Sequence, residues 1–299
     1  MMETPDTEGI DKAGTILTGP SVPEKSAISL SAESFSNKDE DRVMFKSIFR
    51  VLFYALLAVT LNSCAKKDER SIQDGTGNRR MSYKVKPVLG TIELNGQWNE
   101  GQWKDVDVLE LTNYMGDKPE HFPKTQARLL YDKDNLYVFF RVEDRYVRAV
   151  AEKTNGKVWQ DSCVEFFFTP DAELKDIYFN LETNCGGTIL FCYNDKQNNV
   201  RKYAEAADCQ KVEVYHSLPK IIADEITEPV VWTLSYKLPF DVIAKYGEIT
   251  KPQSGVIWRA NFYKCADKTS HPHWLTWSFV DNSTPNFHLP QYFGTLEFE

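Results

Sequence analysis

The chain has 299 residues, of which 42% are hydrophobic and 26% are charged, and its formal net charge is −8 at pH 7. This composition is typical of a globular protein. An acidic chain without a basic stripe is a poor ligand for a polyanion, so nucleic acid is excluded as a partner.

The N-terminal segment has the composition of a chain that does not fold. Residues 1–42 are rich in Ser, Glu, Asp, Lys and Gly and contain few aromatic residues. Such a segment cannot bury enough apolar surface to offset the entropy lost on ordering. We therefore expect residues 1–43 to be a disordered or non-native extension, with Met44 as the start of the protein.

A basic and then apolar segment follows. Lys46 and Arg50 precede an uncharged apolar run at 51–61. This run is too short to span a bilayer, which takes about 20 residues of helix, but it is typical of the apolar region of a signal peptide. The sequence therefore predicts a signal peptide over residues 44–63.

The apolar run ends in L-N-S-C, which resembles the lipobox of bacterial lipoproteins. The plain alternative is a free cysteine after an apolar helix. In lipoproteins the peptide is cut before the cysteine, here Cys64, which then carries lipid chains. Residues 67–69, K-D-E, resemble the acidic export signal of some surface lipoproteins. The resemblance implies a protein anchored by Cys64 to the outer membrane, at the cell surface or facing the periplasm.

Residues 64–82 are polar and contain glycine, which predicts a flexible tether, and we expect one domain over residues 83–299. This domain holds five cysteines, an odd number, so at least one thiol is free. Cys185 and Cys192 flank a predicted hairpin and could pair, but the sequence assigns no bridge. No C-x-x-C motif supports a zinc or thioredoxin-like site.

Short aromatic and β-branched runs separated by turn residues fill the domain, which predicts strands. In chain order the runs are 91–94, 127–131, 136–142, 164–168, 177–182, 188–193, 211–216, 230–238, 257–264, 273–278 and 295–298. Helical periodicity is confined to short pieces such as 240–245. The pattern predicts an all-β fold, an antiparallel β-sandwich of jelly-roll-like or immunoglobulin-like type with short helical pieces.

Tryptophans fall into two groups. In W-T-L-S-Y-K-L, Trp232 shares one strand face with apolar residues while polar residues alternate on the other face, which predicts a core residue. Trp98 and Trp103 lie among glycines and polar residues, so we expect a loop that folds onto the sandwich.

The stretch at 158–168, V-W-Q-D-S-C-V-E-F-F-F, combines a tryptophan and carboxylates with a strongly apolar strand. Alternation places Glu165 on the face opposite Val164 and Phe166. A buried carboxylate is costly unless it is paired or faces a cleft. Asn180 and Glu182 share one face of the next predicted strand.

Polar stripes beneath Trp159 would suit a sugar, because a pyranose has an apolar face that stacks on an indole and a rim of hydroxyls for carboxylates and amides. The alternative is that Glu165 and Glu182 pair with Arg141 or with lysines on a solvated face. Periodicity alone does not favour a sugar-binding site over ion pairs on a solvated face.

Five blocks in order resemble the family 9 carbohydrate-binding modules, over residues 85–298. They are T-I-E-L-N-G-Q-W-N-E-G-Q-W, L-L-Y-D-K-D-N-L-Y-V-F-F-R-V-E-D, V-W-Q-D-S-C-V-E-F-F-F, L-P-F-D and Y-F-G-T-L-E-F. The resemblance implies a β-sandwich in which two aromatic rings clamp a terminal sugar. It also implies a non-catalytic protein that holds a polysaccharide for separate glycoside hydrolases or transporters. Family members occur attached to xylanases, which suggests xylan and explains how a glycosidase label could be inherited.

The resemblance assigns site residues by position. Trp159 is the first clamp ring, Glu165 binds hydroxyls, Asn180 and Glu182 are polar residues of the next strand, and Phe287 stands where the second clamp Trp is usual. The loop before Phe287 is longer than in the best-known members, so Thr284, Asn286 and His288 reshape that wall. No cofactor is implied. Family members carry structural calcium. Asp132, Asp134 and Asp144 are candidate ligands only because acidic residues are dense there, and a solvated hairpin is the favoured alternative.

Two rival functions each have requirements that the sequence can be compared with. A glycosidase needs two carboxylates flanking a bond, about 5 to 9.5 Å apart, whereas Asp161 and Glu165 are about 13 Å apart along an extended chain; Glu165 and Glu182 could be close enough across strands. Related sandwich domains bind haem for electron transfer, which needs axial ligands. The domain offers only Met81, Met115, His121, His216, His271, His273 and His288, so haem is disfavoured.

Overall fold

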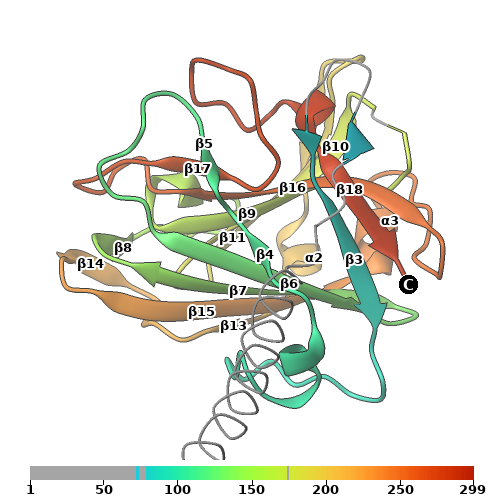
Figure 1. Ribbon diagram of the computed structural model, residues 1–299, viewed down its shortest axis with the longest axis horizontal. Helices are drawn as coiled ribbons and strands as arrows, with labels where there is room; N and C mark the ends of the chain where they lie inside the picture. The colour runs from blue at the N-terminus through green and yellow to red at the C-terminus, as the bar shows by residue number, and fades with distance from the viewer. Residues whose placement is uncertain (1–71, 74–78, 174) are drawn as a thin grey trace, which may run out of the picture. The chain divides into compact units, whose positions relative to one another are not determined.

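Two β-sheets account for most of the described chain. The computed structural model describes residues 72–73, 79–173 and 175–299 (Figure 1). All of these residues belong to one unit. The predicted extension, signal peptide and Cys64 lie outside them. Within the described residues, no helix is both long enough and apolar enough to cross a membrane.

The first sheet runs in the order β3 (Ser82–Pro87), β6 (Lys124–Tyr131), β7 (Asn135–Asp144), β15 (Val230–Pro239) and β13 (Glu213–His216), with β4 (Leu109–Glu110) beside β6. The second runs in the order β12 (Val200–Tyr203), β11 (Ile189–Asp195), β10 (Ile177–Asn184), β9 (Cys163–Thr169), β16 (Ile257–Cys265) and β18 (Gly294–Phe298), with β17 (Trp274–Thr276) and then β5 (Asn113–Tyr114) beside β16. Strand β3 joins the sheets by pairing in parallel with β18 and with β6.

Small elements complete the fold. They are the strand pairs β1 (Ile72–Gln73) with β2 (Arg79–Arg80) and β8 (Val147–Ala149) with β14 (Ile222–Ile226), the helices α2 (Ala206–Cys209) and α3 (Phe240–Ala244), and the 3-10 turns η1 (Gly101–Asp105), η2 (Val158–Gln160) and η3 (Pro290–Tyr292). The predicted β-sandwich with short helical pieces is therefore confirmed. Strands β1 and β2 lie in the segment predicted as a tether, and β3 begins one residue before the predicted domain start.

The strand predicted at 91–94 is wrong. The backbone there is irregular, while Ile92 and Leu94 pack against the core as parts of a loop. The loop turns at Gly96, whose φ of +76° favours glycine, and a Cβ there would meet the ring of Tyr215. Apolar residues in this segment cover a sheet instead of extending one.

The space between the sheets is filled as alternation predicts. Trp232, Leu234, Tyr236 and Leu238 are all fully buried on one face of β15.

Trp98 and Trp103 are buried as well, and each packs edge-on against Phe139 with ring centroids 5.1 Å apart. The predicted loop over the sandwich is therefore confirmed, and it covers the outer face of the first sheet.

One ion pair is wholly buried between the sheets. The Nζ atom of Lys264, on β16, lies 3.5 Å from Asp144 at the end of β7, and both side chains are fully buried. Asp144 also accepts hydrogen bonds from the ring nitrogens of His121 (2.7 Å) and Trp232 (3.1 Å). Burial alone would raise the pKa of Asp144, but these partners outweigh it and hold the pKa below its usual range.

The residues considered for calcium do not form one site. Asp132 and Asp134 precede β7, whereas Asp144 ends it, so the strand separates them. Asp132 accepts hydrogen bonds from the backbone and side chain of Asn135 and from the hydroxyl of Tyr137. These contacts organise the hairpin turn, and Asp144 is already paired with Lys264.

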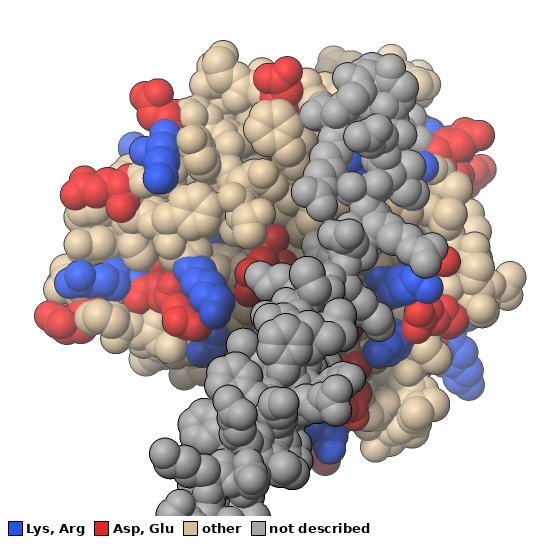
Figure 2. Space-filling model, in the orientation of Figure 1, with Lys and Arg blue, Asp and Glu red and all other residues tan. Residues whose placement is uncertain are grey.

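Charges on the surface are mixed. Figure 2 shows that on this face the described Lys and Arg side chains lie among Asp and Glu side chains. Such interspersed charges produce little long-range field of one sign.

The second sheet is covered on both faces, which positions the site. On β9, Val164, Phe166 and Phe168 face the inter-sheet core, while Cys163 and Phe167 belong to a separate apolar cluster on the outer face. Residues of β10, β11 and β16 belong to the same cluster, and segments around η2 and between β17 and η3 pack over it. The strand predicted at 164–168 is β9, which begins at Cys163, and Trp159 precedes it in η2.

Candidate functional site

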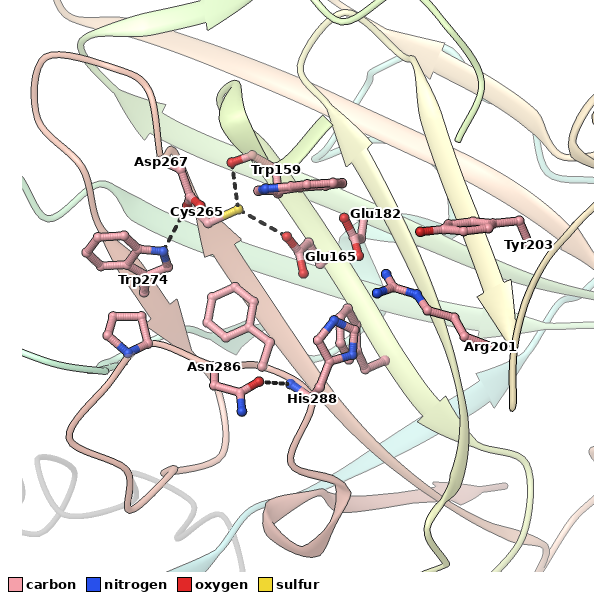
Figure 3. Close-up of a pocket in the computed structure, with 13 residues that line it drawn as sticks. Trp159, Glu165, Glu182, Arg201, Tyr203, Cys265, Asp267, Trp274, Asn286 and His288 are labelled. Carbon is pink, nitrogen blue, oxygen red and sulfur yellow. Dashed lines mark hydrogen bonds between the residues drawn. The ribbon is translucent and has the colours of Figure 1, made fainter. Parts of the chain in front are cut away.

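A pocket of about 280 Å³ opens over the outer face of the second sheet (Figure 3). Its walls come from η2, from β9, β10, β12, β16 and β17, and from the loop before η3. Its lining residues are Trp159, Glu165, Phe167, Glu182, Arg201, Tyr203, Cys265, Asp267, Trp274, Pro285, Asn286, Phe287 and His288. Four of the five predicted sugar-binding residues, all except Asn180, are among them.

Two carboxyl groups lie at the floor. Glu165 on β9 and Glu182 on β10 are directly opposite each other in the strand register, and they are 2% and 4% exposed. Figure 3 shows the two side chains together between Trp159 and His288. Arg141, considered above as their partner, pairs instead with Glu143 at 2.7 Å on the other sheet.

Burial determines the protonation of this pair. It raises the pKa of Glu165 well above its usual value, with added contributions from Cys265 and Glu182, and it raises the pKa of Glu182 to about 7. The thiol of Cys265 donates to Oε1 of Glu165 at 3.0 Å. Oε2 of Glu182 is buried and has no hydrogen-bond partner among the described residues. Near neutral pH the floor can therefore both donate and accept hydrogen bonds.

Asn180 lies behind the floor. Its amide donates to Oε1 of Glu182 at 2.7 Å, and its carbonyl oxygen accepts from the amide of Asn194 at 2.6 Å. It is fully buried and is absent from the pocket lining. Asn180 therefore holds Glu182 and does not itself line the pocket.

Three aromatic side chains differ in what they offer a ligand. Trp159 and Trp274 are partly exposed at the pocket. Phe287 is only 8% exposed, because its ring stacks on Tyr263 with centroids 4.1 Å apart and planes 12° apart. Phe287 therefore lines the pocket with one face already covered, and Trp274 is a second exposed indole that sequence reasoning missed.

The indole N–H of Trp274 donates to Asp267 at 2.8 Å, which fixes the ring. The backbone N–H of Asp267 in turn donates to the carbonyl of Trp159 at 3.2 Å. Burial raises the pKa of Asp267. In the sequence H-W-L-T-W, alternation alone predicts that Trp274 faces away from the core residue Leu275. That Trp274 lies beside Cys265 follows only from the register of β16 with β17, which the sequence does not reveal.

Strand β12 and the loop before η3 form two further walls of the pocket. Arg201 lies over the ring of Tyr203, with its guanidinium carbon 5.2 Å from the centroid, and both side chains are exposed. Of the three residues expected in this loop, Asn286 and His288 line the pocket, whereas Thr284 is not among the lining residues. Burial and nearby cations lower the pKa of His288 to about 4, and its Nδ1 lies 2.9 Å from the hydroxyl of Tyr178. The imidazole is therefore neutral at physiological pH.

Comparison with known proteins agrees with this architecture. The model of carbohydrate-binding family 9 matches residues 97–298. A protein of Bacteroides uniformis that is proposed to bind carbohydrate has a similar structure, with 30% identity and a TM-score of 0.65, over 73% of this chain and 99% of that one.

More distant likenesses were found as well. A family 9 carbohydrate-binding module of Caldicellulosiruptor kristjanssonii, solved with cellotriose, has 14% identity and a TM-score of 0.47 over 73% of this chain and 93% of its own. A family 9 module from the same organism, solved with glucose, has 15% identity and a TM-score of 0.46, over 72% of this chain and 95% of its own. Among curated proteins none matches. With a family match over two thirds of its length and a fold and pocket that agree with it, the chain belongs to carbohydrate-binding family 9.

Proposed function

We propose that the pocket binds the end of a polysaccharide chain and that the protein holds this glycan without cleaving it. The observation that carries the proposal is the pair of buried carboxyl groups, Glu165 and Glu182, at the floor of a pocket with Trp159 in its wall. The pair provides donors and acceptors for hydroxyls, and an indole provides a surface for the apolar face of a sugar. A pocket of about 280 Å³ is small for a ligand site, which favours a terminal ring over an internal segment.

The placement of the carboxyl groups favours binding over hydrolysis. Glycosidases use two carboxyl groups on either side of the scissile bond. Glu165 and Glu182 project from the same face of one sheet, so both approach a ligand from below. A raised pKa suits the acid of a glycosidase, but it suits a carboxyl group that hydrogen-bonds to sugar hydroxyls equally well.

The cellular role that we propose follows from the sequence. Lipid chains on Cys64 would anchor the protein to the outer membrane, with the domain at the cell surface or facing the periplasm. There it would hold polysaccharide, with xylan as the first candidate, for separate glycoside hydrolases or transporters.

Calorimetric titration of the purified full-length protein tests the binding proposal. The panel contains xylan and its oligosaccharides, cello-oligosaccharides, glucose and other host and plant glycans. We expect at least one glycan to bind with Kd in about the micromolar-to-millimolar range. Glu165→Gln should weaken binding, whereas Tyr114→Ala, an exposed aromatic outside the pocket, should leave it unchanged. No heat with any glycan, from folded protein, would overturn the proposal.

Substitution of Cys64 tests the anchor. In cells that express the full-length chain, we expect wild-type protein in the membrane fraction and labelled by a fatty acid. Cys64→Ser should lose the label and leave the outer membrane fraction, because two lipid chains are needed for stable anchoring. A Cys64→Ser protein that still carries the label would contradict the assignment.

A further inference from the structure

Two cysteines and a carboxyl group converge beneath the pocket. Cys163 on β9 and Cys265 on β16 are directly opposite each other in the strand register, and Glu165 follows Cys163 by two residues on the same face. One potential ligand atom from each of the three lies within 4.8 Å of the other two. The three side chains are at most 2% exposed.

This floor is acidic and lacks a paired base. Within the described residues, no Lys or Arg forms an ion pair with Glu165 or Glu182, and Oε2 of Glu182 has no hydrogen-bond partner. Arg201 acts on Glu182 only at longer range. Burial is the main reason that the pKa of Cys163 is raised to about 12. A bound cation would supply the positive charge that the described side chains do not place in contact with this floor.

The chemistry of the donors selects the cation. Thiolate sulfur with a carboxylate oxygen suits a thiophilic ion such as Zn²⁺ or Cd²⁺ and is poorly suited to calcium or magnesium, which prefer oxygen. Zinc bonds sulfur at about 2.3 Å, so two sulfurs in a tetrahedral site are about 3.8 Å apart. Ligand atoms already within 4.8 Å would need to move by roughly an ångström at most.

We propose that Cys163, Cys265 and Glu165 form a binding site for a thiophilic divalent cation at the floor of the pocket. Glu165 and Cys265 line the pocket and give the ion a path of entry, while Cys163 lies behind them. Three protein ligands leave a fourth position open toward the pocket for water or a ligand hydroxyl. Binding releases the thiol protons, so affinity rises with pH. This site does not depend on whether the pocket binds sugar.

The test is a titration of the reduced full-length protein with Cd²⁺, followed by thiolate-to-metal absorption in the ultraviolet and by competition with Zn²⁺. We expect one saturable equivalent per chain and tighter binding at pH 8 than at pH 6. Cys163→Ser and Cys265→Ser should each abolish it. Cys209→Ser is the matched control, since Cys209 is buried away from the pocket, where its thiol donates to the carbonyl of Ala204.

Glu165→Gln keeps both thiols, so it should retain the absorption band but bind Cd²⁺ more weakly than wild type, because one of the three ligands loses its charge. This variant protects the test if a serine variant fails to fold, which circular dichroism would reveal. A band that persists in both serine variants, or no band in folded wild-type protein, would overturn the proposal. So would a Cys163–Cys265 disulfide in the protein as isolated, with no Cd²⁺ binding after reduction.

Discussion

Trp159→Ala is expected to remove glycan binding while the domain stays folded. A buried aromatic anchor at the centre of an interface typically contributes about 2 kcal/mol or more, which is about 30-fold in Kd. At the millimolar end of the expected range such a loss takes binding out of calorimetric reach, and at the micromolar end it is measured directly as the rise in Kd. Stability should fall by no more than about 2 kcal/mol, because the ring is partly exposed and its backbone carbonyl, which accepts from Asp267, is kept.

The contrasting variant is Trp98→Ala. Trp98 is buried against Phe139 and beneath the guanidinium of Arg128, 4.4 Å from its ring. Its truncation should cost about 3–5 kcal/mol of unfolding free energy and leave glycan affinity of the remaining folded protein unchanged. If Trp159→Ala behaved like Trp98→Ala, with large destabilisation and intact binding, Trp159 would be a core residue.

Sequence periodicity predicted the architecture wherever a strand has two unlike faces. The stripe of Trp232, Leu234 and Tyr236 was readable because polar residues alternate with it. Strand β12 was missed because all four of its residues are exposed at a sheet edge, and the run at 91–94 was overpredicted because apolar residues can also pack as a loop. The local pattern of apolar residues indicates which side chains are buried. Whether a buried segment is a strand depends on its backbone pairing with a neighbouring strand, which the local pattern does not show.

The site was predictable where one strand carried the signal and not where strands had to be aligned. Alternation and the family resemblance both pointed to Glu165. Nothing local shows that Cys163 and Cys265, 102 positions apart in the sequence, are cross-strand neighbours. The sequence lacks a C-x-x-C motif, and for that reason it gave no support for a metal site with thiol ligands. That motif places two cysteines on one turn, whereas Cys163 and Cys265 lie on two different strands.

Lys264→Met is expected to cause a large loss of stability. Lys264 and Asp144 are both fully buried between the sheets, and the ammonium also contacts Nε2 of His273 at 2.7 Å. Burial and the charge of Lys264 lower the pKa of His273 well below its usual value, so this imidazole adds no charge beside Asp144 in the wild-type protein. Removing the lysine leaves Asp144 buried without its cationic partner, with only the hydrogen bonds from His121 and Trp232, and breaking a buried pair in this way typically costs about 3–5 kcal/mol. Urea denaturation of the full-length protein measures it.

A double-mutant cycle separates the ion pair from simple loss of packing. Asp144→Asn keeps the shape and part of the hydrogen bonding to Trp232 while removing the charge, so we expect Asp144→Asn with Lys264→Met to be more stable than Lys264→Met alone. Lys84→Met, which removes the exposed pair of Lys84 with Glu299, should change stability by less than about 1 kcal/mol. Additive effects in the cycle would mean that the two charges do not stabilise each other. Coupling would show that this pair ties β16, the strand that carries Cys265 into the pocket, to the opposite sheet.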